Sequence, residues 1–180
     1  FPKGWYNEVQ VQSIVLSADG ENDPDMLALV GASAALMVSD IPWAGPVGAV
    51  RVGRVNGQFV ANPTHTQMLD SALDLVYVGN DRDLVMYEGS ANEISDEDFN
   101  KALLFGHEAI QPMIAAQKEL AARSGKPKRQ ITLNIVPQEI LAEAKALAGK
   151  RIVDALLTPG KLAREAAVSA LTGEIGKKLV

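Results

Sequence analysis

Residues 49–61 read AVRVGRVNGQFVA, and this stretch decides how the first part of the chain folds. Small, β-branched and aromatic residues fill positions 49–55 and 58–61, on either side of Asn56-Gly57. An Asn-Gly pair between two such runs is the strongest short-range signal for a β-hairpin, because a type I′ turn needs positive φ at both central residues. The sequence therefore predicts two antiparallel strands that turn at Asn56-Gly57.

Further strands are expected on both sides of this hairpin. Residues 73–78 and 84–87 are strand-like, and the polar run from Asn80 to Asp83 between them is typical of a turn. Upstream, residues 8–16 (EVQVQSIVL) mix polar and β-branched residues with a period of two, which predicts another strand.

Two helices are predicted around these strands. Pro24 fits the first position of a helix, with Asp23 as its N-cap, and the helical pattern continues to about residue 37. Ser95 is the expected N-cap of a longer helix, and three acidic residues follow it. Pro112 should kink or divide this helix, because proline cannot donate the backbone hydrogen bond.

The run from Ser124 to Arg129 (SGKPKR) interrupts the helical pattern and coincides with a change of charge. Up to residue 123 there are 7 basic and 17 acidic residues, a net charge of −10; beyond it there are 10 basic and 5 acidic residues, a net charge of +5. Residues 138–147, 150–157 and 161–171 are then expected to form short amphipathic helices. The order of elements predicts an α+β domain over 1–125 and a small all-α domain over 126–180.

Composition excludes several classes of protein. The chain has no cysteine, which rules out disulfides, thiol catalysis and cysteine-based zinc sites and fits a reducing cytoplasm. No stretch approaches the ~18–20 apolar residues that a membrane span requires, so we expect no membrane contact. The chain begins at Phe1 without an initiator Met or a signal-peptide profile, and we expect it to start inside a larger protein.

Several stretches, in the same order along the chain, resemble polynucleotide phosphorylase. They include residues 1–11 (FPKGWYNEVQV), 15–25 (VLSADGENDPD), 45–54 (GPVGAVRVGR) and 104–108 (LFGHE). The resemblance implies an RNase PH-like fold of the ribosomal protein S5 domain 2 type. It places residues 1–125 in the later part of the first of two such copies, incomplete at its N-terminus, and the rest at the start of the helical domain that follows.

The resemblance also implies an activity for the parent protein. Members of this family are cytoplasmic enzymes that degrade RNA from its 3′ end, using inorganic phosphate as the nucleophile and releasing nucleoside diphosphates. A divalent metal, usually Mg²⁺, assists them, and three subunits form a ring. We expect RNA, inorganic phosphate and two further copies of the chain as partners of the parent.

The same resemblance implies that this segment carries no catalytic and no metal-binding residue. In the active copy, serines at a helix N-terminus receive phosphate; the matching positions here are Asp23-Pro24-Asp25, where carboxylates repel phosphate and proline lacks an N–H. Asp74 matches one metal carboxylate, but Met68 replaces its partner and Val76 replaces a lysine. We therefore interpret Asp74 as a structural residue, and the 180-residue segment alone as inactive.

The candidates for RNA contact are five basic residues. Lys126, Lys128 and Arg129 lie in the expected linker, where three positive charges suit phosphate, although a solvated linker is the favoured explanation. Arg51 and Arg54 lie on the first strand and could face a channel or an ordinary strand surface.

An alternative class of function remains open. A degenerate RNase PH fold could serve only as an RNA-binding or assembly subunit without enzymatic activity. A downstream second copy with serine and aspartate clusters would favour the enzyme, and its absence would favour the binding subunit.

Overall fold

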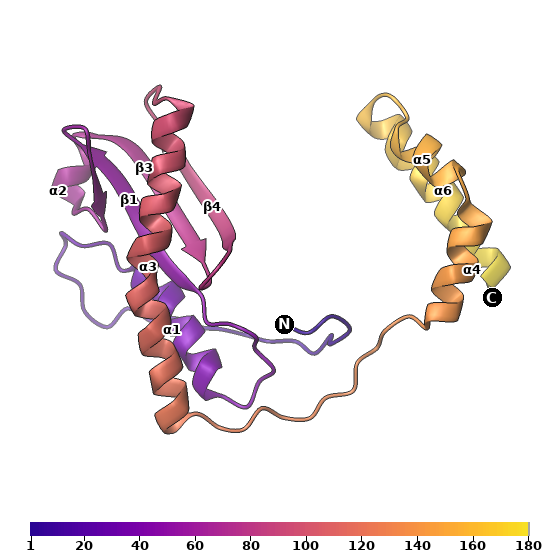
Figure 1. Cartoon of the computed structure of the whole chain (residues 1–180), viewed down its shortest axis with the longest axis horizontal. Helices are drawn as coiled ribbons and strands as arrows, with labels where there is room; N and C mark the ends of the chain where they lie inside the picture. Colours follow the sequence, from indigo (N-terminus) through magenta and orange to yellow (C-terminus); the bar gives the residue numbers. More distant parts are fainter. Residues whose placement is uncertain (180) are drawn as a thin grey trace. The chain divides into compact units, whose positions relative to one another are not determined.

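The structure is a computed structural model that describes residues 1–179, in two compact units, Phe1–Thr132 and Leu133–Val180. The first unit (Figure 1) joins a sheet to helices and is α+β, as predicted. Its elements are α1 (Asp25–Val38), β1 (Gly48–Val55), β2 (Gln58–Ala61), α2 (His65–Met68), β3 (Ser71–Gly79), β4 (Leu84–Ala91) and α3 (Asp96–Ser124).

Both predicted hairpins form, and together they make one antiparallel sheet with the order β2-β1-β3-β4. At the first turn Val55 pairs with Gln58, and the two residues between them have positive φ, 50° at Asn56 and 79° at Gly57. These are the angles that a type I′ turn requires, and only glycine and asparagine adopt them at little cost. The local signal therefore fixed both the turn and its register.

The main core lies between the sheet and α3. Alternate residues of the two central strands face this helix and are almost fully buried. They meet apolar residues spaced along one side of α3; the cluster contains Val50, Val52, Leu73, Leu75, Tyr77, Ala102, Ile110 and Ile114. A smaller cluster on the other face of the sheet joins Met26 of α1 to Ala49 and Val78.

The residue before β1 is held by both helices. The Val47 backbone N–H donates to Ser33 Oγ of α1 over 3.0 Å, and its carbonyl accepts from Gln117 Nε2 of α3 over 3.0 Å. Ser33 and Gln117 are both buried, at 2% and 4% exposure. Buried polar side chains are stable when they are hydrogen-bonded, so these two bonds fix where the chain enters the sheet.

Three details differ from the sequence-based expectation. The predicted strand over residues 8–16 is wrong: it has no regular structure, because no strand among residues 1–179 pairs with it, and Ile14 and Leu16 are 72% and 93% exposed. The N-cap of α1 is Pro24 and not Asp23, whose carboxylate accepts from the Asp25 N–H at 3.2 Å. Pro112 does not divide α3, which is assigned as one helix from Asp96 to Ser124. A tertiary core on both sides of Pro112 outweighs the single backbone bond that proline removes.

The second unit consists of the helices α4 (Gln138–Ala148), α5 (Arg151–Leu156) and α6 (Lys161–Leu179). All three were predicted, and α6 is longer than expected. Gly149 and Gly160 separate them with φ values of +51° and +84°. The units divide after Thr132, while Lys126 and Arg129 donate backbone bonds to the Val38 and Asp40 carbonyls of the first unit. The assignment of two domains at 1–125 and 126–180 stays a prediction.

Across residues 1–179, none of the helices combines the length and the apolarity that crossing a membrane requires.

Two glycines allow a test of the sheet register. A Cβ added at Gly89 of β4 would lie 2.1 Å from the backbone oxygen of Asp74, whereas one added at Gly31 of α1 would have nothing within 4 Å. We expect Gly89→Ala to destabilise the first unit by about 1–3 kcal/mol through overpacking. Gly31→Ala should stabilise it by roughly 0.5–1 kcal/mol through helix propensity.

Urea unfolding followed by tryptophan fluorescence measures both variants, because Trp5 and Trp43 lie in the first unit. Equal urea concentrations at the unfolding midpoint for Gly89→Ala and the unaltered chain would contradict the β3–β4 register.

Candidate functional site

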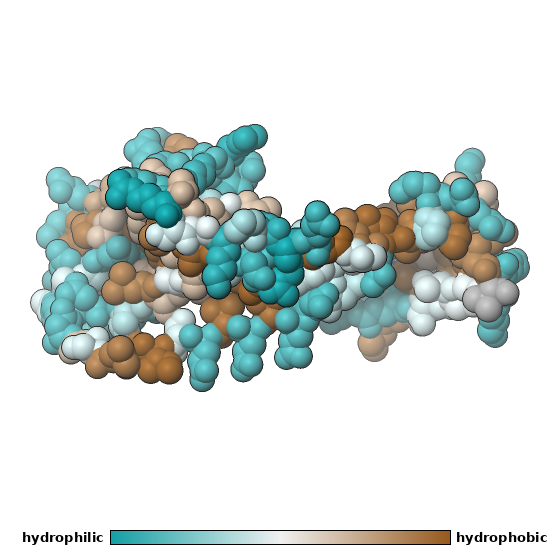
Figure 2. Space-filling model, turned by 90° about the horizontal axis from the view of Figure 1, so that it is seen from below, coloured by the Kyte–Doolittle hydropathy of each residue, from teal (hydrophilic) through white to brown (hydrophobic). Residues whose placement is uncertain are grey.

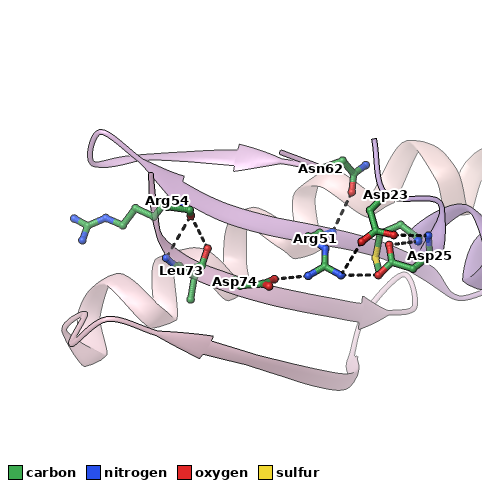
Figure 3. A network of polar contacts seen from close by, with 9 residues as sticks. Asp23, Asp25, Arg51, Arg54, Asn62, Leu73 and Asp74 are labelled. Carbon is green, nitrogen blue, oxygen red and sulfur yellow. Dashed lines mark hydrogen bonds and ion pairs between the residues drawn. The ribbon is translucent and has the colours of Figure 1, made fainter. Parts of the chain in front are cut away.

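Arg51, near the middle of β1, is the centre of a polar network on the sheet face opposite α3 (Figure 3). Its neighbours Val50 and Val52 point into the main core, so strand alternation turns Arg51 to the other side. One terminal nitrogen lies 2.6 Å from Asp25 Oδ2, and the other lies 2.5 Å from Asp74 Oδ1. Asp23 Oδ2 is 3.6 Å from the first nitrogen. A single guanidinium therefore joins the start of α1 to β3.

The backbone around Arg51 is held as firmly as its side chain. Asn62, which follows β2, accepts from the Arg51 N–H through Oδ1 at 3.0 Å and donates its own N–H to the Arg51 carbonyl at 2.7 Å. Asn62 has a φ of +48°, a conformation that asparagine tolerates better than most residues. On the opposite side, Gly53 pairs with Asp74 across β1 and β3, which places the carboxylate beside the guanidinium.

The network is electrically matched to a cation and not to an anion. Three carboxylates surround one guanidinium, so the group carries a net negative charge. Burial acts to lower the pKa of Arg51, but the hydrogen bonds to Asp25 and Asp74 outweigh it and hold that pKa above its ordinary value. Arg51 thus stays charged at any pH at which the protein is folded.

Little space remains beside the network. The adjoining cavity has a volume of about 30 Å³ and is lined by residues around the start of α1, by residues that follow β2, and by Arg51. That volume suits about one water molecule and is too small for a phosphate ion. Asp23-Pro24-Asp25 match the positions of the phosphate cradle in an active copy. The site that they face here excludes phosphate, both by its charge and by its size.

The residues here do not fit a divalent cation either. The Asp74 carboxylate is engaged by Arg51, and Met68 and Val76 stand where the resemblance places a second carboxylate and a lysine. Mg²⁺ prefers several oxygen ligands in octahedral geometry, and a thioether and a valine supply none. Among residues 1–179, no group of three or more histidines, cysteines, aspartates or glutamates has metal-binding geometry.

The other candidates for RNA contact are largely engaged within the chain. Arg54 pairs with Asp98 of α3 at 2.9 Å, and its side chain points away from Arg51 (Figure 3). Lys128 Nζ donates to three carbonyls at the C-terminal end of α1, those of Leu36, Met37 and Ser39, at 2.8–3.1 Å.

Two further linker residues behave differently from each other. Arg129 pairs with Asp40 at 2.7 Å, and this bond holds the pKa of the Asp40 carboxyl below its usual value. Lys126 makes no side-chain hydrogen bond or ion pair with the part of the chain that the structure describes. RNA contact by any of the five basic residues stays a prediction.

Neither histidine lies in the Arg51 network. His65 Nδ1 is 3.3 Å from the Gly20 carbonyl at an exposed position. His107 on α3 is half-buried and contacts the Tyr77 hydroxyl through Nδ1 at 3.0 Å.

The sequence interpretation missed the partnership between Arg51 and its carboxylates. The sequence places Asp25 at a position that matches a phosphate cradle, favours a structural role for Asp74, and makes Arg51 a candidate RNA contact, without connecting the three. A signal was available, because an arginine within an apolar strand of a sheet covered on both faces needs carboxylate partners. The sequence did not say which of the many acidic residues of the first unit would supply them.

Comparisons with known proteins agree with the fold. Residues 45–109 match the profile described as "3' exoribonuclease family, domain 2" (RNase_PH_C). This match covers all four strands of the sheet and the first half of α3, so the first unit has the RNase PH-like fold that the sequence predicted.

Relatives match over nearly the whole chain. A polyribonucleotide nucleotidyltransferase of Methylacidiphilum infernorum (isolate V4) is 49% identical over 183 residues, which cover 100% of this chain and 26% of the relative. One of Opitutus terrae is 50% identical (98% of this chain, 26% of the relative), and one of Thermomicrobium roseum is 48% identical (97% and 22%). The chain thus spans about a quarter of the length of these relatives. Over its whole length it is homologous to one segment of the polyribonucleotide nucleotidyltransferases.

Proposed function

We propose that the chain is part of a phosphorolytic 3′-to-5′ exoribonuclease and that residues 1–180 form a structural, non-catalytic part of it. In the parent, inorganic phosphate attacks the 3′-terminal phosphodiester and a nucleoside diphosphate leaves. The relatives' name, polyribonucleotide nucleotidyltransferase, supports transfer of nucleotidyl groups from RNA. We place the chemistry, with its Mg²⁺, in a second RNase PH-like copy, and the protein in the cytoplasm.

The Arg51 network carries the non-catalytic assignment. Phosphorolysis needs a phosphate site and a metal site that act on the same bond. At the positions that match these two sites, Asp25 and Asp74 bind opposite ends of one guanidinium. Arg51 supplies internally the positive charge that a metal or an electropositive phosphate site would supply in an active copy. The network therefore stabilises the fold at the place where an active copy would do chemistry.

Assembly into a homotrimeric ring is part of this proposal. All of β4 is exposed, and its apolar residues Val85, Met86 and Tyr87 are between 42% and 58% exposed. Figure 2 shows hydrophobic residues lying open among hydrophilic ones on the surface. Open sheet edges with apolar residues are normally covered by another chain or element, which supports a role in subunit contacts.

RNA is the proposed polymeric substrate of the parent, and Lys126 is the best-placed of the five predicted contacts. Arg51, Arg54 and Arg129 are neutralised by carboxylates, and Lys128 by backbone carbonyls. A lysine without such a partner has more electrostatic energy to gain from a phosphate.

The first prediction from this proposal concerns activity. The purified 180-residue chain should release no nucleoside diphosphate from polyadenylate with Mg²⁺ and phosphate. In the full-length parent, Asp74→Asn should change turnover by less than about threefold, whereas loss of a true metal carboxylate costs orders of magnitude. Clear product from the chain alone, abolished by Asp74→Asn, would make this copy an active site and refute the structural assignment.

The second prediction concerns stability. Arg51→Met leaves Asp23, Asp25 and Asp74 facing one another without their cation. We expect a loss of about 1–3 kcal/mol in the unfolding free energy of the first unit. This range is lower than for a fully buried pair, because the carboxylates are 38–39% exposed and water screens their repulsion.

The matched control is Arg123→Met. Arg123 also pairs with a carboxylate, Glu119, but lies on the surface of α3 at 75% exposure. It should change stability by no more than about 0.5 kcal/mol. Urea unfolding followed by tryptophan fluorescence compares the two variants, and equal losses would show that the Arg51 network has no special structural role.

A further inference from the structure

A second polar feature lies on the other face of the sheet, in a groove between α3 and the start of β4. The groove has a volume of about 440 Å³, within the ~300–1,000 Å³ typical of ligand sites. Its wall belongs to the face that holds Val50 and Val52, so the sheet separates it from Arg51. Its lining includes Tyr77, Arg82, Leu84, Asn100, Leu104 and His107.

Two glycines seat the ring of Tyr77 at the bottom of this groove. A Cβ at Gly106 of α3 would lie 2.9 Å from Tyr77 Cγ, and a Cβ at Gly79 would lie 2.9 Å from Tyr77 Cε1. Tyr77 is only 2% exposed as a result. The LFGHE stretch at 104–108, which no part of the proposed function uses, therefore serves this ring: Gly106 makes room for it and His107 contacts its hydroxyl.

The hydrogen bonds around His107 indicate which of its two ring nitrogens carries the proton. Gln111 Nε2 lies 3.1 Å from the His107 carbonyl oxygen, which can only accept, so the atom facing it is the amide nitrogen. The same nitrogen lies 3.2 Å from His107 Nε2 and donates its second hydrogen there. In the neutral tautomer that this contact favours, His107 Nε2 accepts and Nδ1–H donates to the Tyr77 oxygen at 3.0 Å.

One donor is left over at the end of this chain of bonds. Because its oxygen accepts from His107, the Tyr77 O–H must donate elsewhere, and no acceptor for it occurs among the described residues. A buried hydroxyl that lines an open groove without an acceptor for its hydrogen favours a ligand with an acceptor atom. Leu84 and Leu104 offer apolar surface next to it, at 41% and 66% exposure.

The rim of the groove adds a positive charge. Arg82 is the only lining residue with a permanent charge, and its guanidinium has no ion pair within residues 1–179. Its neighbour Asp81 is already bound to Lys118 at 2.8 Å. An anionic group that reaches the rim would therefore meet an unpaired guanidinium, which binds phosphate oxygens well.

We propose that this groove binds one nucleotide unit. Its base lies against Leu84 and Leu104 and accepts a hydrogen bond from the Tyr77 hydroxyl, and its phosphate pairs with Arg82. The choice of a nucleotide over another ring-bearing anion rests on the proposed RNA substrate. A free nucleoside monophosphate and a residue of an RNA chain present the same groups to the site.

The test is NMR titration of the 180-residue chain, observing the methyl groups of Leu84 and Leu104. Adenosine monophosphate, adenosine, ribose 5-phosphate and a hexamer of riboadenylate are added separately. We expect adenosine monophosphate or the hexamer to shift the NMR signals of these methyl groups. A shift with adenosine monophosphate identifies the free nucleotide as the ligand, and a shift with the hexamer identifies RNA. Ribose 5-phosphate should leave them unshifted. Shifts with ribose 5-phosphate alone, or with none of the four, would overturn the proposal.

Three variants separate the contributions. Tyr77→Phe removes only the hydroxyl and should weaken binding by about 3- to 10-fold. Its control is Tyr87→Phe, because Tyr87 pairs directly with Tyr77 across β3 and β4 but does not line the groove; its affinity should stay within about twofold. Arg82→Met, at an exposed turn, should weaken the binding of adenosine monophosphate and leave the binding of adenosine unchanged.

Equal affinities for Tyr77→Phe and Tyr87→Phe would overturn the assignment of the hydroxyl, and an unaffected Arg82→Met would overturn that of the phosphate. Neither readout uses phosphorolysis. Failure of the full-length parent to release nucleoside diphosphate would refute the proposed function and leave the groove result standing. Failure of the groove to bind a nucleotide would refute this inference and leave the proposed function standing.

Discussion

The guanidinium of Arg51 contacts carboxylates from two directions, Asp25 at the start of α1 and Asp74 on β3. This geometry constrains the first unit because the three elements involved lie far apart in sequence. A charge with 18% exposure is stable only beside its partners, so α1 must begin where its acidic residues reach β1. The same contact engages Asp25 and Asp74, two carboxylates that could otherwise bind a cation.

The remainder of the fold follows from β1 being covered on both faces. One face carries Val50 and Val52 against α3, and the other carries Ala49 and Arg51 near α1. Val47 precedes the strand and is bonded to both helices, which holds them at the same end of the sheet. β4 has no comparable cover, and its exposure marks the side of the unit that is open to partners.

The two polar clusters illustrate how one sheet separates two kinds of role. Around Arg51 the guanidinium is paired with carboxylates from two elements, and the adjoining cavity has room for about one water, which favours a structural role. Around Tyr77 each group donates to the next, from Gln111 to His107 and from His107 to Tyr77. The Tyr77 hydroxyl is left as an unused donor in a groove of about 440 Å³. Satisfied networks rigidify a fold, while an unused donor beside apolar surface is a feature of binding sites.

The sequence by itself determined the local structure: the Asn56-Gly57 turn, the second hairpin, the Ser95 N-cap and the helices of the second unit. Each depends on residues within a few positions of one another, where backbone preferences act directly. It failed for residues 8–16, because a strand exists only if another strand pairs with it. Tertiary structure alone brought Arg51 to Asp25 and Asp74, and Tyr77 to His107, since burial and charge require partners without specifying which ones.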